Sequence, residues 1–279
     1  MSLVVNGSVD RSAVIAIEQL VSDGTLASAS YSAEVTSTNS AALDDVRQGT
    51  LSDEQLPRLY LADKQTGGRG RHGRTWLSSD DSLTFSLLTR RTVDRSETAT
   101  LWPIAVGVAI ARAIEFCFAP VKAQLKWPND IYLDGGKVAG ILLETTHGTP
   151  ETVVIGIGIN VNTAPHASGS TGMPSGSDGI NAKSIASVVG RPNNRYELLS
   201  PLVQQVIEAT QVVVDSPSEF ISEFRRRCWL SGKQVTYQEN GLPKSAICRG
   251  INDDGELLLE TVAGTKTCHT GEVNLVRTK

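Results

Sequence analysis

Cysteine is scarce in this chain of 279 residues, and the four cysteines form neither a CxxC pair nor any spacing typical of a zinc site. So few cysteines also do not suggest a disulfide framework, and we expect reduced thiols in a cytoplasmic protein. The four histidines form no HxH or HxxxH pair. The sequence therefore predicts neither a cysteine-ligated zinc site nor a His-based metal centre.

Long apolar runs are also missing, because none reaches the ~18 residues that a membrane-spanning helix needs. The first twenty residues lack a basic region followed by an apolar core, so secretion is not expected. An excess of basic residues is absent as well, since 26 Lys and Arg face 30 Asp and Glu, for a net charge of −4. This balance excludes a bulk nucleic-acid binder, and any anion site has to be local.

The hydrophobic and charged patterns predict a large α+β domain at residues 1–227 and a small β domain at 228–279. The first part alternates helix and strand signals, and the second shows four or five short strands separated by glycine-containing turns. Helices are expected at 8–21, 38–48, 98–118, 183–189, 195–215 and 218–226. Strands are expected at 31–36, 58–62, 83–88, 121–127, 131–133, 138–145, 152–161, 235–238, 246–249, 257–261 and 265–269.

The most informative segment is QTGGRGRHGRTW at residues 65–76. Its four glycines allow the backbone amides to turn toward one point, and Arg69, Arg71 and Arg74 add permanently charged donors. Such a loop is suited to phosphate. A solvated basic loop and an RNA-gripping segment are the alternatives, and the acidic net charge weighs against the second.

Two further segments carry polar groups at strand ends. KWPND at 126–130 offers Asn129 and Asp130, and Lys137 begins the strand of GGKVAGILLE at 135–144. An ordinary hairpin turn with an exposed lysine would also explain the latter. GIGINVN at 156–162 is not a dinucleotide fingerprint, because its glycines lie inside an apolar strand, where they indicate close approach by another group.

Taken together, these segments resemble the biotin–protein ligases. The resemblance covers roughly Thr36 to Arg277 and rests on five motifs in the family's order: Ser37-Thr38-Asn39, Gln65 with 68–74 and Trp76, 126–130, 137–144 and 156–160. It implies a class II synthetase-like catalytic domain of the biotin–lipoate ligase type, with a mixed sheet flanked by helices, and a C-terminal SH3-like β-barrel. It also implies an AMP-forming biotin–[acetyl-CoA-carboxylase] ligase that uses ATP, Mg²⁺ and biotin.

The same resemblance implies roles for individual residues. Lys137, Arg71 and Asp130 would be catalytic, with Asp130 acting on the acceptor lysine. Biotin would contact Ser37, Thr38, Asn39, Gln65, Gly68, Arg69, Arg71, Trp76, Lys137 and Gly140. ATP would contact Arg69, Arg71, Arg74, Lys126, Asn129, Lys137, Asn160 (at the adenine) and Arg277.

The implied partner is a biotin carboxyl carrier protein or domain of a biotin-dependent carboxylase, and a homodimer is conceivable. Ser37 comes too early for a preceding winged helix, so we expect a monofunctional enzyme that binds no DNA. We also expect the loop 67–74 and the Gly/Ser/Pro-rich segment 164–179 to be mobile without ligand. The alternatives are a lipoate–protein ligase or octanoyltransferase of the same fold, and a non-catalytic nucleotide- or RNA-binding module.

Overall fold

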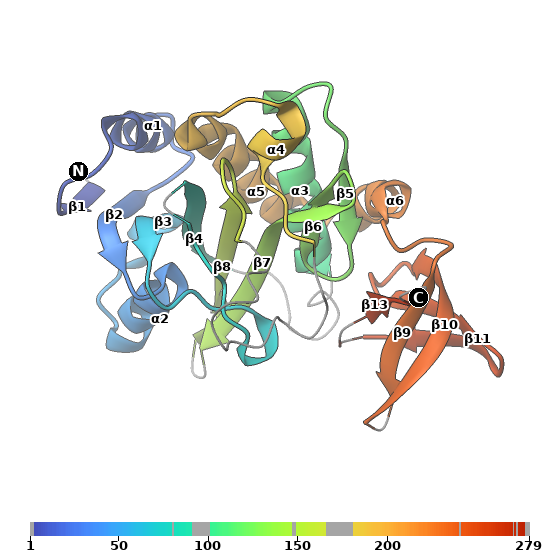
Figure 1. Ribbon diagram of the computed structural model, residues 1–279. Coiled ribbons are helices and arrows are strands. Elements are labelled where there is room, and N and C mark those ends of the chain that lie inside the picture. Colours follow the sequence, from blue (N-terminus) through green and yellow to red (C-terminus); the bar gives the residue numbers. More distant parts are fainter. Residues whose placement is uncertain are drawn as a thin grey trace.

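Eight strands form one mixed sheet in the computed structural model, which describes residues 3–79, 81–90, 101–146, 149–165, 181–239, 241–269, 271 and 273–276 (Figure 1). Their order across the sheet is β1-β2-β3-β4-β8-β7-β6-β5. The strands are β1 (Leu3–Asn6), β2 (Ser28–Val35), β3 (Arg58–Gln65), β4 (Ser82–Arg90), β5 (Ala123–Lys126), β6 (Asp130–Leu133), β7 (Gly136–Thr146) and β8 (Thr149–Asn160).

The pairing of neighbouring strands changes once across this sheet, from parallel to antiparallel. The pairs β1–β2 and β2–β3 are parallel, and every pair from β3–β4 to β5–β6 is antiparallel. The sequence reading missed β1, because four residues of which three are exposed give too short a signal. The turn between β6 and β7 has left-handed backbone at both Asp134 and Gly135, as a tight hairpin requires.

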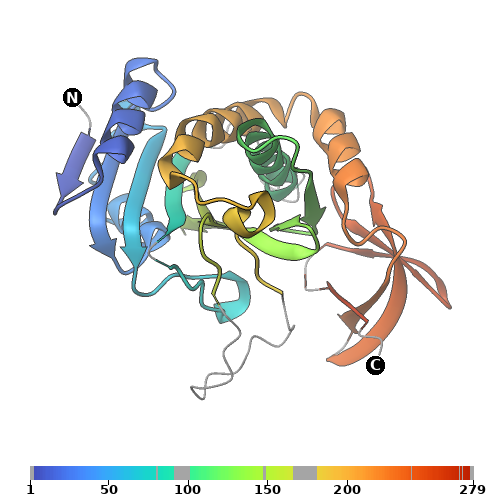
Figure 2. The same cartoon turned by 45° about the horizontal axis from the view of Figure 1, so that its top comes forward.

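Helices cover both faces of this sheet (Figures 1 and 2). In β3, Leu59 and Leu61 join the main core with α1, α3 and α5, whereas Tyr60 joins a smaller core with Ala42 and Leu43 of α2. Alternate residues therefore face opposite helical layers, as the pleat of a strand requires. The helices are α1 (Arg11–Ser22), α2 (Thr38–Gln48), α3 (Leu101–Cys117), α4 (Ile185–Val189), α5 (Leu199–Val212) and α6 (Pro217–Arg227), with short 3₁₀ turns η1 (Asp53–Gln55), η2 (Arg71–Gly73) and η3 (Arg195–Leu198).

The chain leaves α6 and forms a second, antiparallel sheet of five strands in the order β12-β11-β10-β9-β13. These strands are β9 (Gln234–Glu239), β10 (Leu242–Ile251), β11 (Leu257–Thr261), β12 (Gly264–Cys268) and β13 (Val273–Leu275). The α+β body with a small antiparallel β domain is thus confirmed. Across the described residues, no helix combines the length and apolarity needed to cross a membrane.

The small β domain contacts the main body at the end of β5. The Trp127 indole N–H donates to Gly255 O at 3.0 Å, and Lys126 Nζ donates to Asn274 Oδ1 at 3.0 Å. Trp229 N–H also donates to Leu125 O at 2.9 Å. The segment that follows, with Asn129 and Asp130, is therefore anchored from outside the eight-stranded sheet.

Candidate active site

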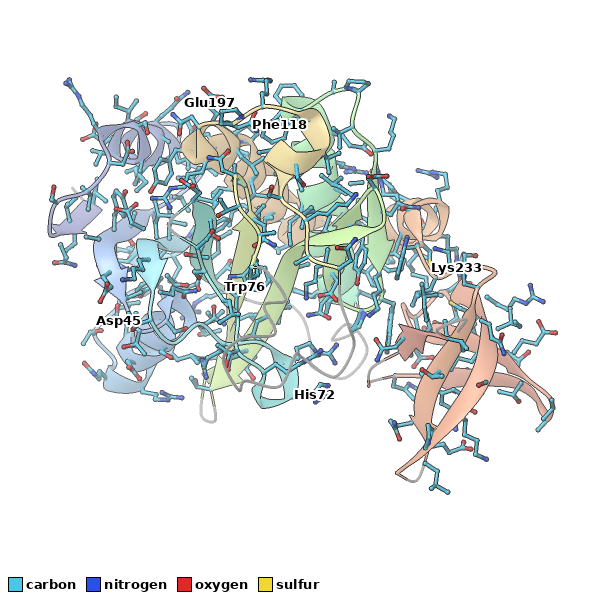
Figure 3. The ribbon with its side chains drawn as sticks, in the orientation of Figure 1. Asp45, His72, Trp76, Phe118, Glu197 and Lys233 are labelled. Carbon is cyan, nitrogen blue, oxygen red and sulfur yellow. The ribbon has the colours of Figure 1, made fainter. Side chains whose placement is uncertain are left out.

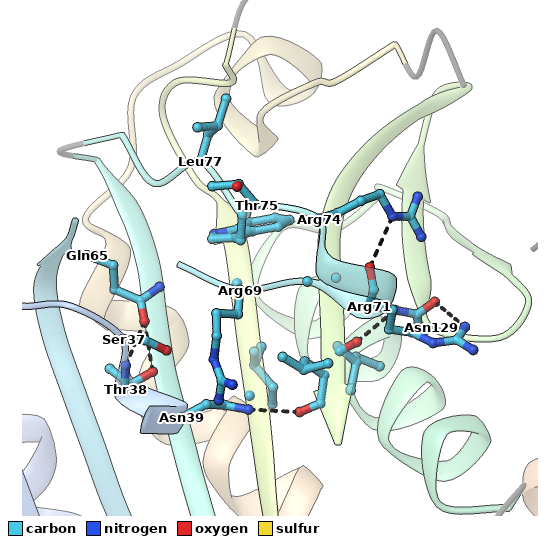
Figure 4. A pocket seen from close by; sticks show the side chains of 18 of the residues that line it. Ser37, Thr38, Asn39, Gln65, Arg69, Arg71, Arg74, Thr75, Leu77 and Asn129 are labelled. Atoms are coloured by element: carbon cyan, nitrogen blue, oxygen red, sulfur yellow. Dashed lines mark hydrogen bonds between the residues drawn. The ribbon is translucent and has the colours of Figure 1, made fainter. Parts of the chain in front are cut away.

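A cavity of about 670 Å³ opens over the central strands β7 and β8, beside the N-terminus of α2 (Figure 4). Ser37, Thr38 and Gln65 lie on one side of it, and Arg71, Arg74 and Asn129 lie on the other. The apolar lining comes from Trp76, Leu77, Phe85, Ile141, Leu142 and Ile157. An apolar hollow with a few convergent polar groups is the usual form of a small-molecule site.

The arginine- and glycine-rich loop closes one side of this cavity as a small hairpin. Trp76 N donates to Gly68 O at 2.9 Å, and Gly70 N donates to Arg74 O at 2.8 Å. The turn at its tip has left-handed backbone at His72 and Gly73. Figure 3 shows His72 at this outer tip and Trp76 beside the central strands. Mobility of the loop remains a prediction, and residues 166–179 of the second segment predicted to be mobile lie outside the described residues.

Glycines in β7 and β8 let the Trp76 ring lie against the sheet. A Cβ atom on Gly158 would come within 2.4 Å of the ring, and one on Gly140 within 3.3 Å. A Cβ on Gly156 would come within 2.1 Å of Asn39 Oδ1. The close approach that the sequence predicted for GIGIN is thus made by two side chains of the protein itself.

Each cation at the cavity has a polar partner that fixes its position. Lys137 Nζ lies 2.6 Å from Asp130 Oδ1, and both side chains are mostly buried. Arg69 forms an ion pair with Glu144 at 2.6 Å. Arg71 donates to Asn129 Oδ1 at 3.3 Å. These contacts hold positive charge in place over an apolar floor. Electrostatic attraction to a bound anion is stronger there than in water.

The opposite side of the cavity presents neutral hydrogen-bonding groups. The Gln65 Oε1 atom accepts from the Thr38 backbone N–H at 2.8 Å and lies 3.1 Å from Thr38 Oγ1. Ser37 caps α2 by accepting from Ser40 N at 3.4 Å. Gly68 borders this group, since a Cβ there would lie 2.5 Å from Trp76 O and 3.2 Å from Gln65 Nε2.

A buried cluster around Asp63 supports the strand that carries Gln65. Asp63 Oδ1 accepts from Tyr31 OH at 2.7 Å and from Arg195 at 2.7 Å, and it is also bonded by the Tyr196 hydroxyl. Burial raises the pKa of Tyr31 to about 12 and raises that of Tyr196 further, so both phenols keep their protons at neutral pH. The cluster ties β2 and β3 to η3 two residues before Gln65.

Comparison with known proteins decides the family. Residues 31–160 match the model of the biotin/lipoate A/B protein ligase family, and residues 230–276 match the biotin protein ligase C-terminal domain. The bifunctional ligase/repressor BirA of Bacillus subtilis is 30% identical over 241 residues, which cover 81% of this chain and 69% of that protein. The chain belongs to the biotin protein ligase family.

Two other members of the biotin protein ligase family match over most of their length. The biotin–[acetyl-CoA-carboxylase] ligase of Mycobacterium tuberculosis is 29% identical over 219 residues, which cover 77% of each chain. The biotin protein ligase of Aquifex aeolicus, solved in complex with biotin and ATP, superposes with a TM-score of 0.73 at 27% identity. That match covers 90% of this chain and 99% of the Aquifex chain.

Most residues predicted from the family resemblance meet at the cavity. Those that line it are Ser37, Thr38, Asn39, Gln65, Arg69, Arg71, Arg74, Trp76, Asn129, Asp130, Lys137 and Gly140, and Gly68 lines an adjoining hollow under the loop. Lys126 and Asn160 lie outside this lining. The Asn160 side chain is buried, with Nδ2 bonded to Lys183 O at 3.2 Å and no partner for Oδ1 among the described residues. Arg277 lies outside the described residues.

Two polar residues of the site had no role in the sequence prediction. Glu144 ends the GGKVAGILLE motif and contacts both Arg69 and Asn39. Ser86 is fully buried in β4 beneath Thr38 and Asn39. Strand β4 also carries hydroxyls at Ser82, Thr84 and Thr89, so nothing in its sequence singles out Ser86.

Proposed function

We propose that this protein joins biotin to ATP to form biotinyl-5′-AMP and then transfers biotin to a lysine of a biotin carboxyl carrier protein or domain. The observation that carries the proposal is one cavity that combines neutral hydrogen-bonding groups on one side with fixed cations on the other. The match to a biotin-ligase C-terminal domain favours this activity over lipoate transfer.

The first step needs cations more than it needs a base. A carboxyl group on an alkyl chain has an ordinary pKa of ~4–5, so the biotin carboxylate is already ionised at pH 7. Its approach to the α-phosphate of ATP brings like charges together, at a cost of about 4 kcal/mol per pair at ~4 Å and an effective dielectric of 20. We assign Arg69, Arg71 and Lys137, which line the cavity, to offset this repulsion. The carboxylate oxygen bonds to the α-phosphorus, and pyrophosphate leaves.

Lys137 is the cation we assign to the α-phosphate. Asp130 holds its ammonium group at 2.6 Å, and the Trp76 ring lies 5.8 Å from Nζ. Both contacts fix the direction of a flexible side chain before ATP binds, so little ordering remains to be done in the transition state.

The second step needs removal of a proton from the acceptor. A free lysine has a pKa near ~10.4 and attacks only as the neutral amine. Among the described residues that line the cavity, Asp130 is the only carboxylate, and we assign it to this proton. The amine nitrogen then bonds to the biotin carbonyl carbon, and AMP leaves with the electron pair of the broken C–O bond.

Magnesium would enter on the nucleotide. The described residues contain no group of three His, Cys, Asp or Glu side chains that could hold a metal ion. The two carboxylates nearest the cavity, Asp130 and Glu144, are each engaged by a cation. This donor set does not form a metal site, and Mg²⁺ belongs to the proposal only as the ion that ATP carries on its phosphates.

The test is exchange of labelled pyrophosphate into ATP by the purified protein. We expect exchange that depends on biotin and is not supported by lipoate. Exchange with lipoate instead of biotin would indicate a lipoate ligase, and no exchange with either acid would refute the adenylation step and leave a binding module.

A further inference from the structure

A chain of hydrogen bonds runs beneath the cavity from Thr38 to Glu144. Ser86 Oγ lies 2.7 Å from Thr38 Oγ1 and 2.5 Å from Asn39 Oδ1. Asn39 Nδ2 donates to Glu144 Oε2 at 2.8 Å. The chain links three separate elements, α2, β4 and β7, and its middle residue, Ser86, is fully buried.

The direction of these bonds is fixed by the carboxylate at one end. The Asn39 amide faces Glu144 Oε2 and Leu142 O, and both of these atoms only accept. The nitrogen of the amide therefore lies on that side, and its oxygen faces Ser86. An amide oxygen cannot donate, so the single proton of Ser86 goes to Asn39 Oδ1.

Thr38 has to supply the proton for the next bond. Ser86 has given its only proton to Asn39, so the 2.7 Å contact between the two hydroxyls is bonded only if Thr38 donates. The other acceptor within reach, Gln65 Oε1, lies farther away at 3.1 Å and already receives the Thr38 backbone N–H. Because the shorter bond to Ser86 takes the Thr38 proton, the Thr38 hydroxyl offers only lone pairs to a ligand.

Gln65 presents the complementary group beside it. Because its oxygen faces Thr38 N–H, its Nε2 faces away, where the described residues provide only a 3.5 Å contact to Ser78 Oγ. The site thus sets an acceptor, Thr38 Oγ1, next to a donor, Gln65 Nε2. A cyclic urea has the matching edge, with N–H beside C=O.

We propose that Ser86 and Glu144 are positioning residues that hold Thr38 as a hydrogen-bond acceptor for a ureido N–H of the substrate. This inference rests on the proposed function, since it takes biotin as the ligand. Ser86 and Glu144 act through Asn39 and Thr38 and need not touch biotin. Their contribution is to specificity: a ring atom that can only accept a hydrogen bond would meet the lone pairs of Thr38.

The test compares biotin with two analogues in which one or the other ureido N–H is replaced by a ring oxygen. The wild-type protein should disfavour one analogue by roughly 100-fold in kcat/KM for adenylate formation, mainly through KM, because a buried hydrogen bond is replaced by facing lone pairs. Ser86→Ala frees the Thr38 proton from its shortest partner, so the hydroxyl can turn and donate to the analogue. We expect the preference for biotin to fall at least about fivefold.

A second variant and a control separate this role from a structural one. Glu144→Gln keeps the side-chain volume but removes the charged acceptor, so only the longer 3.3 Å bond to Leu142 O still orients the Asn39 amide. This variant should therefore also lower the preference. Thr84→Val removes a buried hydroxyl from the same strand, one bonded to Ala62 O at 3.3 Å, and should leave the preference unchanged. Thermal unfolding of each variant identifies loss of fold.

The outcomes distinguish this inference from the proposed function. Wild-type protein that forms no adenylate with biotin would refute the function itself. Wild-type activity with equal acceptance of both analogues, or a preference within about twofold of wild type in both Ser86→Ala and Glu144→Gln, would refute the hydrogen-bond chain while leaving the function intact.

Discussion

The close approach of Trp76 to the sheet predicts a large effect of one methyl group at Gly158. A Cβ atom there would lie 2.4 Å from Cε2 and 2.6 Å from Nε1 of the indole ring. Favourable contacts between such atoms lie at about 3.5–4.0 Å, so Gly158→Ala creates an overlap of more than about 1 Å. Strand β8 is paired with β4 and β7 at this residue, and the strand cannot easily move away.

The loop that carries Trp76 should therefore move away from the sheet, and the Trp76 ring should no longer line the cavity. Overpacking of this kind costs about 1–3 kcal/mol, and a loss of that size in binding weakens biotin affinity by roughly 5- to 150-fold. Isothermal titration with biotin measures the affinity, and pyrophosphate exchange gives the KM. We expect both to change, with a much smaller change in melting temperature, because the strain is relieved in a surface hairpin.

Two matched glycine variants calibrate this prediction. Gly140→Ala brings a Cβ to 3.3 Å from the same ring and should weaken biotin binding only a few-fold. Gly107→Ala in α3 meets its nearest side chain at 3.7 Å, an ordinary contact, and should leave binding unchanged. Biotin affinity of Gly158→Ala within about twofold of wild type would refute the assignment of Trp76 as a wall of the site.

Three further predictions follow from the geometry. Lys137→Ala should lower adenylate formation by on the order of 10²- to 10³-fold in single-turnover assays, whereas Lys64→Ala at an exposed ion pair should not; equal rates would remove Lys137 from the reaction. Trp127→Phe deletes the indole bond to the C-terminal domain and should cost about 1 kcal/mol in urea unfolding; unchanged stability would show that the bond is not needed. Burial alone would raise the pKa of Glu223, but hydrogen bonds from two arginines outweigh it and hold this pKa below its ordinary value of 4.5, so this stabilisation is present above pH 4.5 and is lost as the pH falls through the lower, folded-state pKa. Melting temperature against pH should thus fall less steeply in acid for Glu223→Gln, and parallel curves would contradict this.

Local patterns in the sequence predicted most of the secondary structure, and most of the residues they singled out lie together at the cavity. The helix predicted at 38–48 is α2, and Gly49 ends it in left-handed conformation, but the residue that caps it is Ser37 and not Thr38 or Asn39, as the sequence had suggested. The ends of the helices and strands were predicted less accurately than their existence. The helix predicted at 195–215 is a 3₁₀ turn followed by α5, and the strand predicted at 246–249 extends from Leu242 to Ile251.

The sequence by itself determined the set of chemical groups. These are the arginine- and glycine-rich loop, a lysine at the start of a strand, and glycines within an apolar strand. These signals depend on neighbouring residues, whose conformational preferences act over a few positions. The pairing of those groups was decided by tertiary structure. Asn39 meets Glu144 across 105 residues of sequence and Ser86 across 47, and both contacts exist only because α2, β4 and β7 come together. Hydrogen-bond direction depends on such partners, so no single segment of the chain could have specified that Thr38 accepts.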